Sequence, residues 1–384
     1  MDKQKQLRRI YDIVAHEGDD YVQNLGAMGT PIYQTSLFVD CGLEHNYGYT
    51  RSGNPTFDVG EQKIALMEKA EDAAFTSAGM SAISLAMLSC VKTGEHILTL
   101  KNVYGGSKLQ LKYFERFGIE TSYVPGNSLD DFENAIRPNT RLIYLESPST
   151  FMFEMQDIEE IVKLAKSKGI RTMIDNTWAT PVYQNPIKYG VDLVIHSCSK
   201  YLGGHSDLVG GVIVGAKELI EEIRKVERLN FGCQMDPHQA WMTIRGIRTL
   251  PVRLEQSMQN TTVIANFLEK HPCVQEVKWP GLASYPQKKL ADKYLYGCSG
   301  LFSIITKGTM EQARNFVGNT AIFNRAPSWG GYDSLITAVG CTQESVEQNS
   351  ITPGLIRVAI GLESSETLME ALDTSLRKYI KYII

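Results

Sequence analysis

The sequence lacks the short motifs that mark several large classes of enzyme. It contains no GxxxxGK[ST], GxGxxG or GxSxG segment, so phosphate-loop NTPases, Rossmann dinucleotide-binding proteins and serine hydrolases with a nucleophile elbow lack their signatures. Its histidines never occur at HxxxH spacing, which excludes a zincin. The seven cysteines never form a CxxC pair, so we expect no metal site and reduced thiols in a cytoplasmic protein.

Charge of one sign and long apolar runs are also missing. The chain has 39 Lys and Arg against 43 Asp and Glu, so it offers neither a basic face for nucleic acid nor a polybasic membrane anchor. No apolar run reaches the roughly 18 residues of a spanning helix, and the first residues lead into no apolar signal segment. We therefore expect no nucleic-acid partner and no membrane partner.

What the chain does have is enough apolar material for a full core. Of its 384 residues 43% are hydrophobic, which excludes a disordered protein. Strands predicted at 73–77, 96–99, 120–124, 141–146, 171–175 and 193–197 are mostly separated by helical stretches such as 56–69, 80–91 and 158–168. This alternation predicts an α/β fold with a mostly parallel sheet covered on both faces, whose strands end along one edge.

The pattern divides the chain into three parts. Residues 1–48 are polar and irregular, and we interpret them as an N-terminal arm. Residues 49–245 form the predicted large α/β domain. Asp236-Pro237 is a strong helix start, and it opens a long helical region leading to a smaller α+β domain over 246–384 with strands near 274–278, 301–306 and 355–360.

Polar residues gather at the predicted strand ends. A glycine at a helix N-terminus offers free N–H groups to a phosphate, and hydroxyls can add further donors. A lysine beside such a site, with a carboxylate one strand away, matches the needs of pyridoxal phosphate: the lysine binds its aldehyde, and the carboxylate keeps the pyridine nitrogen protonated. The residues with this arrangement are Gly79, Met80, Asp175, Ser197, Ser199 and Lys200.

Each of these residues also has an ordinary structural explanation. A lone lysine is commonly a solvated surface residue. An aspartate such as Asp175 at the end of a strand is commonly a turn former. Gly79 alone could serve only close packing. Spacing by itself therefore leaves both interpretations open.

A resemblance adds to this pattern. The segment 194–211, VIHSCSKYLGGHSDLVGG, resembles the pyridoxal-lysine segment of the Cys/Met-metabolism enzymes of fold type I, which include cystathionine synthases and lyases and methionine γ-lyase. The resemblance covers essentially the whole chain. Further segments in family order are PIYQTSLF (31–38), YGYTRSGNPT (47–56), SAGMSAIS (77–84), VYGGS (103–107), ESP (146–148), IDNTWATP (174–181) and GLIRVAIGLE (354–363).

The resemblance implies a PLP-dependent enzyme with a defined set of cofactor contacts. The implied contacts are Lys200 for the covalent bond, Asp175 for the pyridine nitrogen, Tyr104 for stacking on the ring, and Gly79, Met80, Ser197 and Ser199 for the phosphate. Tyr49 and Arg51 are implied to reach the phosphate of the neighbouring subunit, which predicts a homodimer with shared active sites, usually paired into a homotetramer.

The resemblance also implies the catalytic and substrate contacts. Lys200, Tyr104 and Tyr49 are the implied catalytic residues. Arg357 is implied to bind the α-carboxylate of a small sulfur amino acid, for which a planar two-pronged donor is suited. Tyr104, Ser328 and Trp329 are the other expected substrate contacts.

Two departures from the family pattern concern the cofactor. The family often reads Glu-Ser-Pro-Thr-Asn-Pro, in which the Asn bonds the ring hydroxyl, whereas this chain has Glu146-Ser147-Pro148-Ser149-Thr150-Phe151. That contact is therefore missing or made by Thr150. Ser199 replaces the usual Thr before the lysine but keeps the hydroxyl.

The reaction type depends on local features. SWGGYDSL (328–335) resembles the loop of bacterial cystathionine β-lyase, where γ-active enzymes usually have Leu in place of Trp329, and IDNTWA is similar to the same branch. Gly106 stands where methionine γ-lyases usually carry Cys. These features predict a carbon–sulfur β-lyase of cysteine and methionine metabolism that cleaves cystathionine, cystine or cysteine to a thiol, pyruvate and ammonia.

Alternatives remain at this point. YGYTRSGNPT is typical of γ-active enzymes, so cystathionine γ-synthase, cystathionine γ-lyase or an O-acylhomoserine sulfhydrylase is the second hypothesis. Trp329 could be only a packing residue in a rigid turn. A binding or regulatory protein that keeps the fold without catalysis is a third hypothesis, of a different class.

Overall fold

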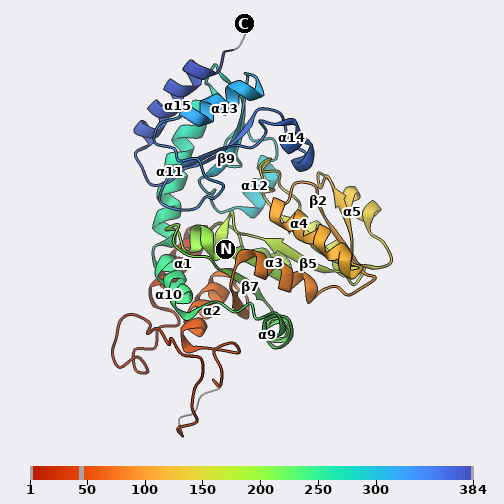
Figure 1. Ribbon diagram of the computed structural model, residues 1–384, viewed down its shortest axis with the longest axis vertical. Coiled ribbons are helices and arrows are strands. Elements are labelled where there is room, and N and C mark those ends of the chain that lie inside the picture. Colours follow the sequence, from red (N-terminus) through yellow and green to blue (C-terminus); the bar gives the residue numbers. More distant parts are fainter. Residues whose placement is uncertain (1–2, 43–46, 382–384) are drawn as a thin grey trace.

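The computed structural model describes residues 3–42 and 47–381, and its core is built on two β-sheets (Figure 1). The larger sheet has seven strands in the order β1-β7-β6-β5-β4-β2-β3. Its strands are β1 (Asp72–Thr76), β2 (His96–Leu100), β3 (Glu120–Val124), β4 (Thr140–Glu146), β5 (Arg171–Asp175), β6 (Leu193–Ser197) and β7 (Gly211–Gly215).

The larger sheet is mostly parallel, as the strand–helix alternation predicts. Strands β3, β2, β4, β5 and β6 run parallel to one another, and β7 runs antiparallel to both β6 and β1. Every residue of β2 and of β7 is buried, so both faces of the sheet are covered there. The parallel strands place Glu146, Asp175 and Ser197 at their carboxyl ends.

Helices fill the connections between the strands and cover the sheets. The helices are α1 (Lys3–His16), α2 (Pro55–Glu68), α3 (Gly79–Leu88), α4 (Gly105–Phe114), α5 (Leu129–Ala135), α6 (Ile158–Ser167), α7 (Thr180–Tyr183), α8 (Lys217–Ile223), α9 (Leu229–Phe231), α10 (Pro237–Arg248), α11 (Leu250–Glu269), α12 (Lys288–Tyr294), α13 (Met310–Asn319), α14 (Gln343–Asn349) and α15 (Ser365–Tyr379). None of the helices in the described part of the chain could cross a membrane.

The smaller sheet lies in the C-terminal part of the chain and is antiparallel. Its order is β10-β11-β9-β8, with β8 (Val274–Lys278), β9 (Leu301–Thr306), β10 (Leu335–Ala338) and β11 (Leu355–Ala359). The side chain of Asp236 accepts a hydrogen bond from the His238 N–H and so begins α10, as predicted. Helices α10 and α11 then lead from the large sheet to the small one (Figure 1). The predicted division at residue 245 falls inside α10 and stays a prediction.

The N-terminal arm is not wholly irregular, which corrects the sequence-based expectation. Helix α1 packs against α2, α10 and α11 through the buried side chains of Ile10, Ile13 and Val14. These three residues have i, i+3, i+4 spacing, but the stripe is short and lies in a strongly polar segment. Beyond α1, the arm extends away from the two sheets (Figure 1).

Candidate active site

A cavity of about 670 Å³ lies where the carboxyl ends of β4, β5 and β6 face the small sheet. Residues of both sheets line it, including Asp175 from β5 and Arg357 from β11. The structure thereby brings together most of the residues that the sequence singled out. Those that line the cavity are Gly79, Met80, Tyr104, Asp175, Ser197, Ser199, Lys200, Trp329 and Arg357.

Lys200 lies in the helical turn that follows β6, and its amine points toward the small domain. Lys200 Nζ donates a hydrogen bond to Ser328 Oγ at 2.8 Å and lies 5.5 Å from the centroid of the Trp329 ring. Burial, together with the charge of Arg357, lowers the pKa of Lys200 from 10.5 to about 8, although Asp175 opposes the shift. A substantial fraction of the amine is therefore neutral near pH 8 and able to act as a nucleophile.

Asp175 ends β5 and is held by the residue two positions on. The backbone N–H and the hydroxyl of Thr177 both donate to Asp175 Oδ1, at 2.9 and 2.5 Å. Burial raises the pKa of Asp175, while these hydrogen bonds and the charges of His196 and Lys200 counter the shift. Thr177, within IDNTWATP, was not predicted from the sequence to be a site residue. Its position two residues after the strand-ending carboxylate was the available signal.

A second buried carboxyl, Glu146, stands beside Asp175 at the end of β4. The two residues are direct partners in the parallel register, so their side chains project from the same face of the sheet. Glu146 Oε2 accepts the Tyr104 N–H at 2.7 Å, and Oε1 accepts the Thr150 hydroxyl. Burial and the charge of Asp175 raise the pKa of Glu146 to about 8.

This arrangement decides which carboxyl ionises first. Asp175 accepts two hydrogen bonds from Thr177 and lies near the amine of Lys200, so it takes the charge, and Glu146, with its pKa raised to about 8, keeps its proton at neutral pH. Glu146 was not predicted from the sequence to be a site residue, although it begins the segment ESP (146–148). The hydroxyl of Thr150 is directed to Glu146, and a contact of Thr150 to the cofactor stays a prediction.

The start of α3 provides a concave backbone surface. A Cβ placed on Gly79 would lie 2.9 Å from both Cβ and Oγ of Ser197, so only glycine allows this helix to approach the end of β6 so closely. Ala78 before the helix makes no side-chain cap, and Ala78, Gly79 and Met80 at the start of α3 line the cavity. This surface, beside the Ser197 and Ser199 hydroxyls, suits a phosphate group.

Arg357 reaches the cavity from the small sheet. It is 8% exposed, and its Nη2 donates to the carbonyl of Ser328 at 3.0 Å and to Thr337 Oγ1 at 3.2 Å. Burial lowers the pKa of Arg357 to about 10, so the guanidinium keeps its charge at neutral pH. Its position suits the binding of a carboxylate that enters the cavity.

The turn that carries Ser328 and Trp329 packs directly on the backbone of Lys200. Gly330 has φ +86°, and a Cβ there would lie 2.8 Å from the Tyr201 nitrogen and 3.0 Å from the Lys200 carbonyl carbon. The Trp329 and Tyr201 rings contact each other with centroids 5.5 Å apart. Trp329 therefore packs against the lysine segment and also lines the cavity.

Tyr49 and Arg51 are not brought to this cavity by their own chain. They line a separate hollow of about 390 Å³, formed by the arm together with the segment before α10. The Arg51 guanidinium lies 5.0 Å from the centroid of the Tyr49 ring. Arg51 therefore lies outside the lining of the cavity that its own chain forms.

Comparison with known proteins identifies the family. The model of the Cys/Met metabolism PLP-dependent enzymes matches residues 12–377. The chain belongs to this family. It is 37% identical to an L-methionine gamma-lyase of Porphyromonas gingivalis, over 99% of this chain and 100% of that protein. It is 38% identical to a cystathionine beta-lyase of Lactococcus lactis subsp. cremoris, over 95% of this chain and 98% of that protein.

The fold agrees with that of solved members of the family. A cystathionine gamma synthase from Xanthomonas oryzae pv. oryzae matches with a TM-score of 0.91 and 32% identity, over 96% of this chain and 98% of the other. The fold is therefore that of the type I PLP enzymes, and the cofactor is pyridoxal phosphate. The names of the relatives include both γ- and β-acting enzymes, so family membership specifies carbon–sulfur chemistry without the bond position.

The residues of the cavity fit this cofactor. A partly neutral lysine, a half-buried carboxylate held by Thr177, and a helix N-terminus that begins with glycine are the groups that an aldehyde, a pyridine nitrogen and a phosphate need. The roles of the individual residues stay predictions.

Proposed function

We propose that the protein is a carbon–sulfur β-lyase that cleaves cystathionine, cystine or cysteine to a thiol, pyruvate and ammonia. The observation that carries the proposal is the place of Trp329: the indole lines the cavity 5.5 Å from Lys200 Nζ. A bulky ring at this position narrows the space around the β and γ carbons of the substrate. It favours a conformer in which the Cβ–S bond is aligned for cleavage, while it leaves the lysine little freedom to act at Cβ.

The side chains that line the cavity have different roles in the proposed reaction. Bound pyridoxal phosphate supplies an electron sink for the α-carbon of the substrate. Lys200 Nζ removes the α-proton, which its lowered pKa allows near neutral pH. Arg357 would hold the α-carboxylate, and Tyr104 at the cavity wall would pack on the ring of the cofactor. Asp175 would supply the negative charge that keeps the pyridine nitrogen protonated.

One observation concerns the methionine γ-lyase alternative. A Cβ on Gly106 would lie 2.4 Å from the Tyr104 ring and 2.8 Å from Met80 Sδ. A cysteine there would therefore displace the tyrosine that lines the cavity. The γ-active alternative keeps the support of the segment 47–56 and of the relatives named as gamma-lyases.

We also propose that the active site is shared between two subunits of a homodimer, which pairs further into a homotetramer. Tyr49 and Arg51 line a hollow apart from the cavity of their own chain, so a partner's cavity is where they can act. The arm before them exposes apolar side chains, with Val22 at 88% and Leu25 at 97%, which a second copy would cover. The free thiols of this small-molecule enzyme suit a cytoplasmic location.

Product analysis tests the reaction. Purified enzyme should convert cystathionine to pyruvate, whereas release of 2-oxobutyrate or net synthesis of cystathionine would support the γ-active alternative. Steady-state comparison of cystathionine, cystine and cysteine then identifies the preferred substrate. Borohydride should fix the pyridoxyl group on Lys200, and Lys200→Ala should lose nearly all turnover; label on another lysine would contradict the assignment.

Subunit mixing tests the shared site. Arg51→Ala and Lys200→Ala should each be inactive, but a heterodimer has one site in which both residues are intact. Mixing the two variants should therefore restore part of the activity. No recovery after demonstrated subunit exchange would show that each site is built from one chain.

A further inference from the structure

We propose that Arg228 is a positioning residue that links the turn carrying Tyr49 and Arg51 to the strand that leads into the phosphate-binding start of α3. The inference rests on the proposed shared active site. In a dimer of that kind, Arg228 would connect a turn that serves the partner's cofactor to the loop that serves the cofactor of its own subunit.

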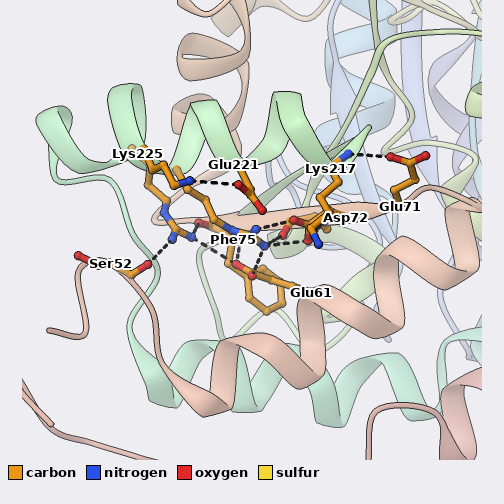
Figure 2. A network of polar contacts seen from close by, with 11 residues as sticks. Ser52, Glu61, Glu71, Asp72, Phe75, Lys217, Glu221 and Lys225 are labelled. Atoms are coloured by element: carbon orange, nitrogen blue, oxygen red, sulfur yellow. Dashed lines mark hydrogen bonds and ion pairs between the residues drawn. The ribbon is translucent and has the colours of Figure 1, made fainter. Parts of the chain in front are cut away.

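Arg228 is a buried cation whose guanidinium spans three acceptors from separate segments. It is 1% exposed, and its Nη1 donates to Glu61 Oε1 and to the Phe75 carbonyl, both at 3.3 Å. Its Nη2 donates to the carbonyl of Ser52 at 3.0 Å. Figure 2 shows Ser52, Glu61 and Phe75 gathered around this network, although they are far apart in the sequence.

The contact with Ser52 holds the turn in which Arg51 lies. The N–H groups of Ser52 and Gly53 donate to the Tyr49 carbonyl at 2.8 and 3.3 Å, which closes the turn around Arg51. The Thr50 N–H donates to the Ser36 carbonyl at 2.9 Å and fixes the other side of the turn to the arm. The backbone of Arg51 is therefore bracketed by two anchors, and the buried one is Arg228.

On its other side Arg228 holds β1. Glu61, which pairs with Arg228, also accepts the Phe75 N–H at 2.7 Å. Glu61 and Arg228 together therefore bind the backbone N–H and the backbone carbonyl of Phe75. A second path runs through Cys233: its N–H donates to the Arg228 carbonyl at 3.2 Å, and its carbonyl accepts the Ser77 N–H at 2.7 Å. Ser77 lies two residues before Gly79.

The chemistry of the contacts explains why this residue is an arginine. A planar guanidinium can donate in several fixed directions at once, whereas a lysine ammonium at the same place could not reach all three acceptors in good geometry. Arg224, one helical turn earlier, offers a comparison. It donates to Glu61 Oε2 at 2.7 Å, to Asp72 and to the Ala73 carbonyl, and so belongs to the same ionic network on the β1 side.

A double-mutant cycle on cofactor affinity tests the proposal. The holoenzyme is stripped of pyridoxal phosphate and titrated with it, and the dissociation constant is measured for wild type, Arg51→Ala, Arg228→Gln and the double variant. We expect Arg228→Gln to weaken cofactor binding about tenfold, the effect of losing one charge-assisted hydrogen bond that positions the turn. We expect the double variant to bind less weakly than the product of the two single effects predicts, because Arg228 exerts part of its effect through Arg51.

Two further variants keep the test sharp. Arg228→Lys preserves the charge beside Glu61 and guards against a failure to fold; it should weaken binding in the same non-additive way. Arg224→Gln is the matched control, and its effect should simply multiply with that of Arg51→Ala. Multiplicative effects of Arg228→Gln and Arg51→Ala, or wild-type affinity in both Arg228 variants, would overturn the inference. If Arg51→Ala itself keeps wild-type affinity, the shared site is wrong, and the inference falls with it.

Discussion

Replacing Glu146 by glutamine should make the cofactor-free protein more stable, increasingly so as the pH rises. In the unfolded chain this carboxyl loses its proton near pH 4.5, and in the native cavity only at about pH 8. Between these values the native state holds a proton that the unfolded state has lost, so stability falls with rising pH. The slope is about 1.4 kcal/mol per pH unit, and the loss reaches about 4 to 5 kcal/mol by pH 8.

Glutamine removes this term without removing the hydrogen bonds. Its carbonyl oxygen can accept the Tyr104 N–H. Its amide can donate to Thr150 Oγ1, which reverses the bond that the Thr150 hydroxyl donates to Oε1 but has the direction that a protonated Oε1 would take. The glutamine side chain therefore imitates the neutral carboxyl of native Glu146, but it does not ionise at any pH of the experiment, whereas Glu146 ionises at about pH 8. The stability of the variant relative to wild type should rise between pH 5 and pH 8 and then level off.

The assay is equilibrium urea unfolding of the cofactor-free proteins at a series of pH values and a fixed protein concentration, since oligomer stability depends on concentration. The same comparison in an Asp175→Asn background provides the control. Without the Asp175 charge the pKa of Glu146 should fall, and the difference should level off at a lower pH. A stability difference that is independent of pH would refute the assignment of Glu146 as the protonated member of the pair.

Three further predictions concern the lysine segment and its surroundings. Gly330→Ala should lower stability by at least about 1 kcal/mol because Gly330 has a left-handed backbone. It should also lower kcat of the folded enzyme, because the new Cβ meets the backbone of Lys200 and Tyr201; unchanged kcat would contradict that contact. Trp329→Leu should lower kcat/KM for β-elimination by about tenfold to a hundredfold, since a shift of about 1 Å costs on the order of a hundredfold, and γ-elimination should rise relative to it. Arg357→Lys, the control, should lower both activities in parallel. An unchanged ratio of β- to γ-elimination in Trp329→Leu would show that the indole is only a packing residue. Incorporation of pyridoxal phosphate into the stripped enzyme needs the neutral amine, so its rate should rise with pH up to about 8 and then level off; a rise that continues toward pH 10 would contradict the lowered pKa of Lys200.

Sequence reasoning worked best where one local pattern governs the structure. The strands 120–124, 171–175 and 193–197 were predicted with the bounds that the structure has. The last two are apolar runs bounded by turn residues, which are a strong local signal, whereas 120–124 is a largely exposed edge strand. β7 and β10 were missed. β7 is a short glycine-bounded segment, and its antiparallel pairing with β1 and β6 depends on contacts far apart in the chain.

The candidate site divides in a similar way. Asp175 and Lys200 follow apolar strands directly, so their common edge could be predicted from the parallel topology. The importance of Glu146 could not, because it depends on the register of β4 against β5, which places the two carboxyls side by side. The pairing of Arg228 with the Ser52 carbonyl likewise joins segments 176 positions apart that no periodicity connects.

The cavity contains two groups with a pKa of about 8, Lys200 and Glu146. Their pKa values are shifted in opposite directions, so their titrations can be distinguished by experiment. Burial lowers the pKa of the lysine because it disfavours a cation, and burial raises the pKa of Glu146 because it disfavours an anion. Below pH 8 Glu146 is neutral and exerts no charge on Lys200. Glu146→Gln should therefore leave the pH dependence of cofactor incorporation unchanged in this range while it removes the contribution of Glu146 to the pH dependence of stability. If one substitution moved both profiles, the two groups would form a single proton-sharing unit, and Asp175 would not be the residue that carries the negative charge of the site.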